Sequence, residues 1–107
     1  MEGVQEMYLV QILLPLYDNE GVAFERKAYD RVRDELARKF DGVTAFRSSP
    51  AEGVWKEGGE FSRDAIIIYE VMAQELERAW WTHYRAELEA RFRQEKLILR
   101  ATSIEQL

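Results

Sequence analysis

Cysteine is absent from the 107-residue sequence, and histidine occurs only once. Without thiols the chain forms no disulfide, and it has neither a thiolate nucleophile nor the sulfur ligands of a structural zinc site. A single His also argues against a soft-metal centre. We therefore expect a fold that is stabilised by its apolar core and a protein that uses no metal or cofactor.

Long apolar runs are missing as well. No stretch approaches the ~20 apolar residues that cross a bilayer, and Met1-Glu2-Gly3 lacks the basic segment of a signal peptide. The absence of cysteine fits a reducing compartment. These features predict a soluble cytoplasmic protein, and the net charge of -5 disfavours both nucleic acids and anionic membranes as partners.

The motifs of two large enzyme classes do not occur. Gly53, Gly58 and Gly59 lack the spacing of a phosphate-binding loop, and no Lys-Ser/Thr pair follows them. No serine has the Gly-x-Ser-x-Gly context of a hydrolase nucleophile. The sequence therefore argues against nucleotide binding and against serine hydrolysis.

Two stretches have the composition of buried strands. Arg63 to Ala73 is rich in β-branched and aromatic residues and contains no Gly or Pro, which is typical of a strand buried on both faces. Met7 to Leu16 has the same character and is stopped by Pro15. We expect these two strands to lie side by side in the centre of a sheet.

Two longer stretches have the period of amphipathic helices. From about Glu25 to Phe40, apolar residues recur every four positions until Asp41-Gly42 ends the pattern, and a second helix is predicted from about Gln74 to Glu95. Carboxylates such as Glu35 are expected on solvated helix faces, in i,i+4 pairs with Arg and Lys. The remaining predicted elements are a turn at Asp18 to Gly21 and short strands at Val43 to Arg47 and at Lys96 to Thr102 or Ile104.

The predicted element order is β-α-β-β-α-β, in one domain over residues 1–107. This order is that of an α+β, ferredoxin-like fold. Right-handed crossovers give a four-stranded antiparallel sheet in the order 4-1-3-2, with both helices on one face. The other face of the sheet has no helix to cover it.

The distribution of charge decides which face the helices cover. On the two central strands, one set of alternating residues is uncharged, whereas the other set includes Gln11 and Glu70. Burying Glu70 beneath helices without a partner would be costly. We therefore predict that the uncovered face, called the open face below, carries Met7, Leu9, Gln11, Leu13, Ile66, Ile68, Glu70, Met72, Ile98, Arg100 and Thr102.

An apolar face of this extent is rarely left in water by a monomer. We expect a homodimer in which two open faces pack together, because one twofold interface covers the same patch on both chains. Gln11, Glu70 and Arg100 come from neighbouring strands and share this face, and they are predicted to form a polar row between the two sheets.

Three segments carry a resemblance to known proteins: Tyr8 to Leu16, Arg47 to Gly53 and Trp80 to Arg85. They are similar to segments of an uncharacterised group of short bacterial proteins. The element order and the apolar open face also resemble the dimeric α+β barrel superfamily, over nearly the whole chain. That superfamily includes cofactor-free monooxygenases, haem-degrading enzymes, isomerase-like proteins and stress-response proteins, so the resemblance implies a dimer but no single activity.

Glu70 and His83 are the candidate catalytic residues. Glu70 is a candidate general base in a site formed by dimerisation, or else it forms a structural pair with Arg100 across or between subunits. His83 lies on the second predicted helix between Trp80 and Tyr84. It is a candidate general acid or base, or a haem ligand, or it is simply a partly buried residue at the edge of the core.

The connection from Ser48 to Ser62 is longer than a hairpin requires, and such loops are often functional. Trp55 within it is either an anchor that docks the loop onto the protein, or part of a lid over a ligand. The candidate residues of a ligand pocket are Gln11, Trp55, Tyr84 and Arg100.

Two function classes remain. The first, which we prefer, is a non-catalytic dimer that binds a small molecule or a protein partner at the open face or in a pocket between sheet and helices. The second is a cofactor-free or haem-dependent monooxygenase or isomerase-like enzyme. A third interpretation, RNA stacking on Tyr8 and Tyr69, is disfavoured because it would make their face the open one and bury Glu70.

Overall fold

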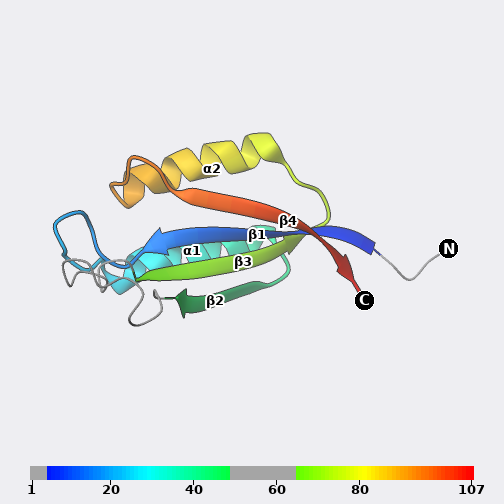
Figure 1. The fold of residues 1–107 in the computed structure, drawn as a ribbon, viewed down its shortest axis with the longest axis horizontal. Helices are drawn as coiled ribbons and strands as arrows, with labels where there is room; N and C mark the ends of the chain where they lie inside the picture. The colour runs from blue at the N-terminus through cyan, green and yellow to red at the C-terminus, as the bar shows by residue number, and fades with distance from the viewer. Residues whose placement is uncertain (1–4, 49–64) are drawn as a thin grey trace, which may run out of the picture.

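The computed structural model describes residues 5–48 and 65–107, which form four strands and two helices (Figure 1). Most of the predicted loop Ser48 to Ser62, including Trp55, lies outside the described residues. The predicted β-α-β-β-α-β order is confirmed. The elements are β1 (Gln5–Pro15), α1 (Arg26–Lys39), β2 (Val43–Ser48), β3 (Ile66–Ala73), α2 (Arg78–Arg91) and β4 (Ile98–Gln106).

The strands form one antiparallel sheet in the order β2-β3-β1-β4. This is the predicted order, and it is compatible with a ferredoxin-like fold. β1 and β3 take the central positions because both are largely apolar on their two faces, whereas the edge strands β2 and β4 are more polar and more exposed. Each central strand therefore has a hydrogen-bonded neighbour on both sides.

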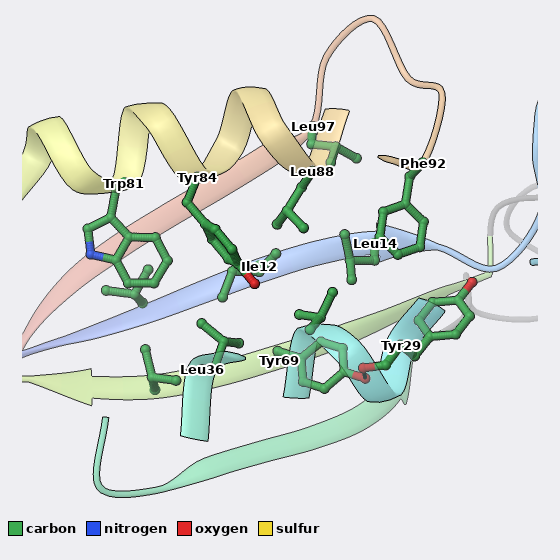
Figure 2. Packing of buried hydrophobic residues seen from close by; sticks show 13 residues of the cluster. Ile12, Leu14, Tyr29, Leu36, Tyr69, Trp81, Tyr84, Leu88, Phe92 and Leu97 are labelled. Carbon is green, nitrogen blue, oxygen red and sulfur yellow. Dashed lines mark hydrogen bonds between the residues drawn. The ribbon is translucent and has the colours of Figure 1, made fainter. Parts of the chain in front are cut away.

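Both helices cover the same face of the sheet, and the core is formed by side chains of the two helices and of that face (Figure 2). Leu36 of α1, Leu88 of α2 and Ile12 of β1 are fully buried. Burial of a side chain of this size contributes about 1.5–3 kcal/mol. The covered face is the uncharged one, as predicted, with Val10, Ile12, Leu14, Tyr69 and Val71 pointing into the core.

Aromatic side chains fill the end of the core near Pro15, the last residue of β1. The ring of Phe92, fully buried just after α2, lies 5.1 Å from that of Phe24 and 5.5 Å from that of Tyr29. The Tyr29 hydroxyl donates to the Pro15 carbonyl at 2.6 Å, and the Tyr69 hydroxyl donates to the Tyr29 carbonyl at 3.1 Å. Burial raises the pKa of Tyr29 to about 12.

The helix α2 is shorter than the predicted Gln74 to Glu95. Leu76 packs against the core from the segment before the helix, so the apolar pattern extends beyond the helical backbone. At the other end, the Phe92 N–H donates to the Leu88 carbonyl at 2.9 Å, and Arg93 then adopts a left-handed conformation with φ of 52°. This conformation ends the helix.

The predicted turn at Asp18 to Gly21 is confirmed. A side-chain oxygen of Asp18, Oδ1, accepts hydrogen bonds from the N–H groups of Glu20 at 2.8 Å and Val22 at 2.9 Å. Gly21 has a φ of 83°, which a residue without a side chain adopts at least cost. The turn reverses the chain between β1 and α1.

Candidate functional site

A row of four polar side chains crosses the open face of the sheet. Gln11 of β1 pairs with Glu70 of β3 on one side and with Arg100 of β4 on the other. Glu70 in turn pairs with Thr44 of β2. The row therefore contains one residue from every strand, all at one level, and residues at one level of a sheet point to the same face.

Hydrogen bonds connect three members of this row. Nε2 of Gln11 donates to Oε2 of Glu70 at 2.5 Å, and Nε of Arg100 donates to Oε1 of Gln11 at 2.7 Å. The amide thus presents its donor to the acid and its acceptor to the base, which is the orientation that both charges favour. Gln11, Glu70 and Arg100 therefore form a row within one chain, and its place between two sheets stays a prediction.

Apolar side chains lie at the levels on both sides of the polar row. One level carries Phe46, Ile68, Leu13 and Ile98, and the other carries Met72 and Leu9 together with Thr102. Phe46, Met72 and Ile98 are 41%, 46% and 55% exposed. These exposed fractions are high for large apolar residues. Together the three side chains form the kind of patch that marks an interaction surface.

A hollow of about 440 Å³ lies beside Glu70 on this face. Leu9 and Met72 give it apolar walls, while Thr44, Glu70 and Asp41 give it oxygen atoms that accept hydrogen bonds. Among the described residues, no Lys or Arg lines it. The volume is within the range of small-molecule sites in proteins.

Of the other candidate residues, Trp55 lies outside the described residues, and His83 and Tyr84 lie on the helix side of the sheet. His83 is exposed on α2, and Tyr84 of the same helix is buried in the core. The sheet separates both from the polar row. Within one chain, the structure therefore brings Gln11, Glu70 and Arg100 together, but it does not bring His83 or Tyr84 to them.

A smaller pocket, of about 220 Å³, lies between α2 and β4. Val10, Trp81 and Leu99 give it an apolar floor, and Arg78 and Arg85 lie at its edge. Of the candidate pocket residues that the structure describes, only Arg100 borders it, and the guanidinium of Arg100 is engaged with Gln11 on the opposite face. This pocket is therefore separate from the polar row.

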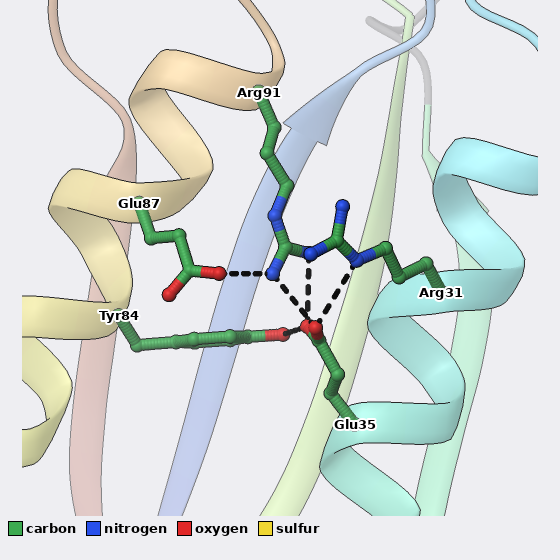
Figure 3. Close-up of polar contacts among 5 residues, drawn as sticks. All are labelled: Arg31, Glu35, Tyr84, Glu87 and Arg91. Carbon is green, nitrogen blue, oxygen red and sulfur yellow. Dashed lines mark hydrogen bonds and ion pairs between the residues drawn. The ribbon is translucent and has the colours of Figure 1, made fainter.

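Glu35 does not lie on a solvated helix face, contrary to the prediction. It forms the expected i,i+4 pair with Arg31, at 3.3 Å, but it also joins α1 to α2 (Figure 3). Oε1 accepts a hydrogen bond from the Tyr84 hydroxyl at 2.9 Å and one from Nη1 of Arg91 at 2.8 Å. Nη2 of Arg91 donates to Oε2 of Glu35 at 2.7 Å and also pairs with Glu87.

The electrostatics of this cluster are those of a structural link between the helices. Burial opposes the ionisation of Glu35, but hydrogen bonds from Arg91 and Tyr84 outweigh it and lower the pKa of Glu35. Burial and the neighbouring carboxylate of Glu35 raise the pKa of Tyr84. One signal in the sequence was available, since Tyr84 and Arg91 are seven residues apart and therefore share one face of α2.

Two further findings concern the described part of the chain. Within residues 5–48 and 65–107, no three His, Asp or Glu side chains are grouped so as to hold a metal ion. Neither of the two helices found there combines the length and the hydropathy that a membrane crossing needs. When the sequence is compared with models of protein families and with curated proteins, neither comparison gives a match.

Proposed function

We propose that this protein is a small non-catalytic homodimer that covers its open face with a second copy and binds a small molecule beside the polar row. The observation that carries the proposal is the hydrogen-bonded chain from Arg100 through Gln11 to Glu70, set among apolar side chains on the face that no helix covers. Polar groups in such a setting are typical of binding sites, where they fix the orientation of a ligand or partner.

The exposed apolar side chains support a second copy as the cover. A twofold interface uses the same patch twice, so each chain covers on its partner what it exposes itself. Ile98 and Met72 lie on either side of the polar row and are about half exposed. An interface centred on the row covers both of them.

The hollow beside Glu70 supports the binding of a small molecule. Its walls combine the apolar atoms of Leu9 and Met72 with the oxygens of Thr44 and Glu70. In the proposed dimer the second sheet closes the open side of the hollow. The enzyme class has weaker support, because within one chain Glu70 and His83 lie on opposite sides of the sheet and do not form an acid and base pair.

Light scattering after size exclusion tests the dimer at micromolar concentration. We expect the wild type to have the mass of two chains and Ile98→Glu to have the mass of one, because the variant places a charge among the apolar side chains of the interface. Val22→Glu is the matched control, since Val22 is 59% exposed but lies in the turn before α1. A monomeric wild type, or an Ile98→Glu variant that remains a dimer, would contradict the proposal.

A fragment screen by protein NMR tests the binding site. We expect the amide signals of Thr44, Glu70 and Met72 to shift when the same fragments are added. We expect the substitution Glu70→Gln to weaken the binding of those fragments. Glu75→Gln, at an exposed position before α2, is the control. Two results would argue against this site: fragments that shift only the amide signals of residues on the helix side, or fragments that bind the Glu70→Gln variant as tightly as the wild type.

A further inference from the structure

The polar row has a negative end and a positive end. Glu70 in β3 and Arg100 in β4 flank Gln11 in β1, so the two charges lie two strands apart, or about 10 Å. Gln11 bonds to both through the two ends of its amide. The open face therefore presents one acid and one base to whatever packs on it.

Charge complementarity distinguishes between the possible twofold arrangements of two open faces. The axis of a face-to-face dimer lies in the plane between the sheets. An axis along the row sets Glu70 against Glu70 of the partner subunit and Arg100 against Arg100 of the partner subunit, and like charges in an interface cost several kcal/mol. An axis parallel to the strands reverses the row, so that acid faces base.

We propose that the twofold axis runs parallel to the strands and passes by Gln11, so that Glu70 of each copy pairs with Arg100 of the partner subunit. This inference rests on the homodimer proposed above. It also completes the hollow beside Glu70, because the carboxylates of Glu70 and Asp41 line it without a described Lys or Arg. The guanidinium of the partner's Arg100 supplies the opposite charge.

The same axis matches apolar side chains on both sides of the row. It keeps each level of the sheet facing the same level of the other sheet, with the strand order reversed. Leu13 then faces Leu13 of the partner subunit, Leu9 faces Leu9 of the partner subunit, and Ile98 faces Ile68 of the partner subunit.

Two charge reversals test whether the polar row of one chain faces the polar row of the partner subunit, and the double reversal described below then separates the two axes. Each homodimer of Glu70→Arg, or of Arg100→Glu, brings two like-charge contacts together across the interface. A heterodimer of the two variants has two opposite-charge contacts, although the row within each chain is disturbed to the same extent as before. When equal amounts of the two purified variants are mixed, the statistical ratio of heterodimers to all homodimers is one to one, and we expect native mass spectrometry to find a ratio of roughly three to one or greater.

The control mixture uses Glu105→Arg and Arg78→Glu, two exposed positions on β4 and α2 that point away from the open face. Here we expect the statistical share of heterodimers. If the wild type is a dimer but the test mixture also gives only that share, the proposed axis is wrong and the dimer stands. If the wild type is a monomer, the proposed function itself fails.

The double variant Glu70→Arg, Arg100→Glu separates the two axes, because its mixed dimer with the wild type has like-charge contacts for an axis parallel to the strands and opposite-charge contacts for an axis along the row. It also covers the case in which a single reversal does not fold. Its acid and base still flank Gln11, whose amide serves both after turning over. We expect it to dimerise alone as the wild type does but to form few mixed dimers with the wild type, because such dimers contain only like-charge contacts. Free mixing of the double variant with the wild type would overturn the inference.

Discussion

Replacing Glu35 by Gln tests whether the link between the helices stabilises the fold. The substitution keeps the shape of the side chain but removes its charge and turns one acceptor of the Arg91 guanidinium into a donor. The Glu35 side chain is 25% exposed and that of Arg91 is 15% exposed, so water replaces these bonds only in part. Hydrogen bonds to charged groups contribute about 1.5–3 kcal/mol, and we expect a loss of about 2 kcal/mol.

The loss has a defined dependence on pH. The folded-state pKa of Glu35 lies below its usual value of 4.5, so its ionised form stabilises the folded state. The difference in stability between wild type and Glu35→Gln is therefore fully present above pH 4.5. It declines as the pH falls from 4.5 through the lower pKa of the folded state.

Thermal unfolding followed by circular dichroism measures the effect. A loss of about 2 kcal/mol lowers the midpoint by roughly 10 °C in a domain of this size. Asp34→Asn on the same helix is the control, because Asp34 is 55% exposed in its pair with Arg33 and its loss costs less than about 0.5 kcal/mol. Equal midpoints for the two variants at pH 7, or a difference that grows as the pH falls, would refute this reasoning.

Three further substitutions address the packing. Tyr29→Phe removes the bond to the Pro15 carbonyl and should cost about 1 kcal/mol at neutral pH by urea unfolding. The pKa of Tyr29 is raised from 10.0 to about 12, so the neutral hydroxyl stabilises the fold fully below pH 10 and this contribution is lost as the pH rises toward 12. The wild type should therefore lose more stability than Tyr29→Phe over that interval. Phe92→Ala should cost about 3–5 kcal/mol, since the ring is fully buried against Phe24, and a loss below about 1 kcal/mol would mean that the ring is not in the core. Gly21→Ala should lower the unfolding free energy by about 1 kcal/mol because of the φ of 83°, and an unchanged midpoint would show that the turn tolerates a side chain.

The open face followed from the sequence because the side chains of a strand alternate. Once Gln11 and Glu70 are assigned to the open face, every second residue of β1 and β3 lies on that face with them. Alternation gives the face but not the level. That Gln11 lies opposite both Glu70 and Arg100 is a matter of register, which the pairing of three strands determines together.

The link at Glu35 and the ends of α2 did not follow from the sequence. A charged residue four positions after Arg31 fits a solvated helix pair equally well, and only the packing of two helices brings Arg91 to it. Leu76 continues the apolar pattern although its backbone is not helical. Periodicity reports which side chains meet the core, and it does not distinguish a helix from an adjoining segment that packs the same way.

The pairing of the first strand with the last has a consequence for synthesis. Gln5 of β1 lies opposite Gln106 of β4, so one edge of β1 finds its neighbour only when the residues up to the end of β4 have left the ribosome. Until then a strand rich in Leu, Ile and Val has unsatisfied backbone groups along that edge, which is the kind of template on which other chains aggregate. A polypeptide that stops before Ile98 should therefore precipitate in the cell, even though most of the residues that build its core have already been made.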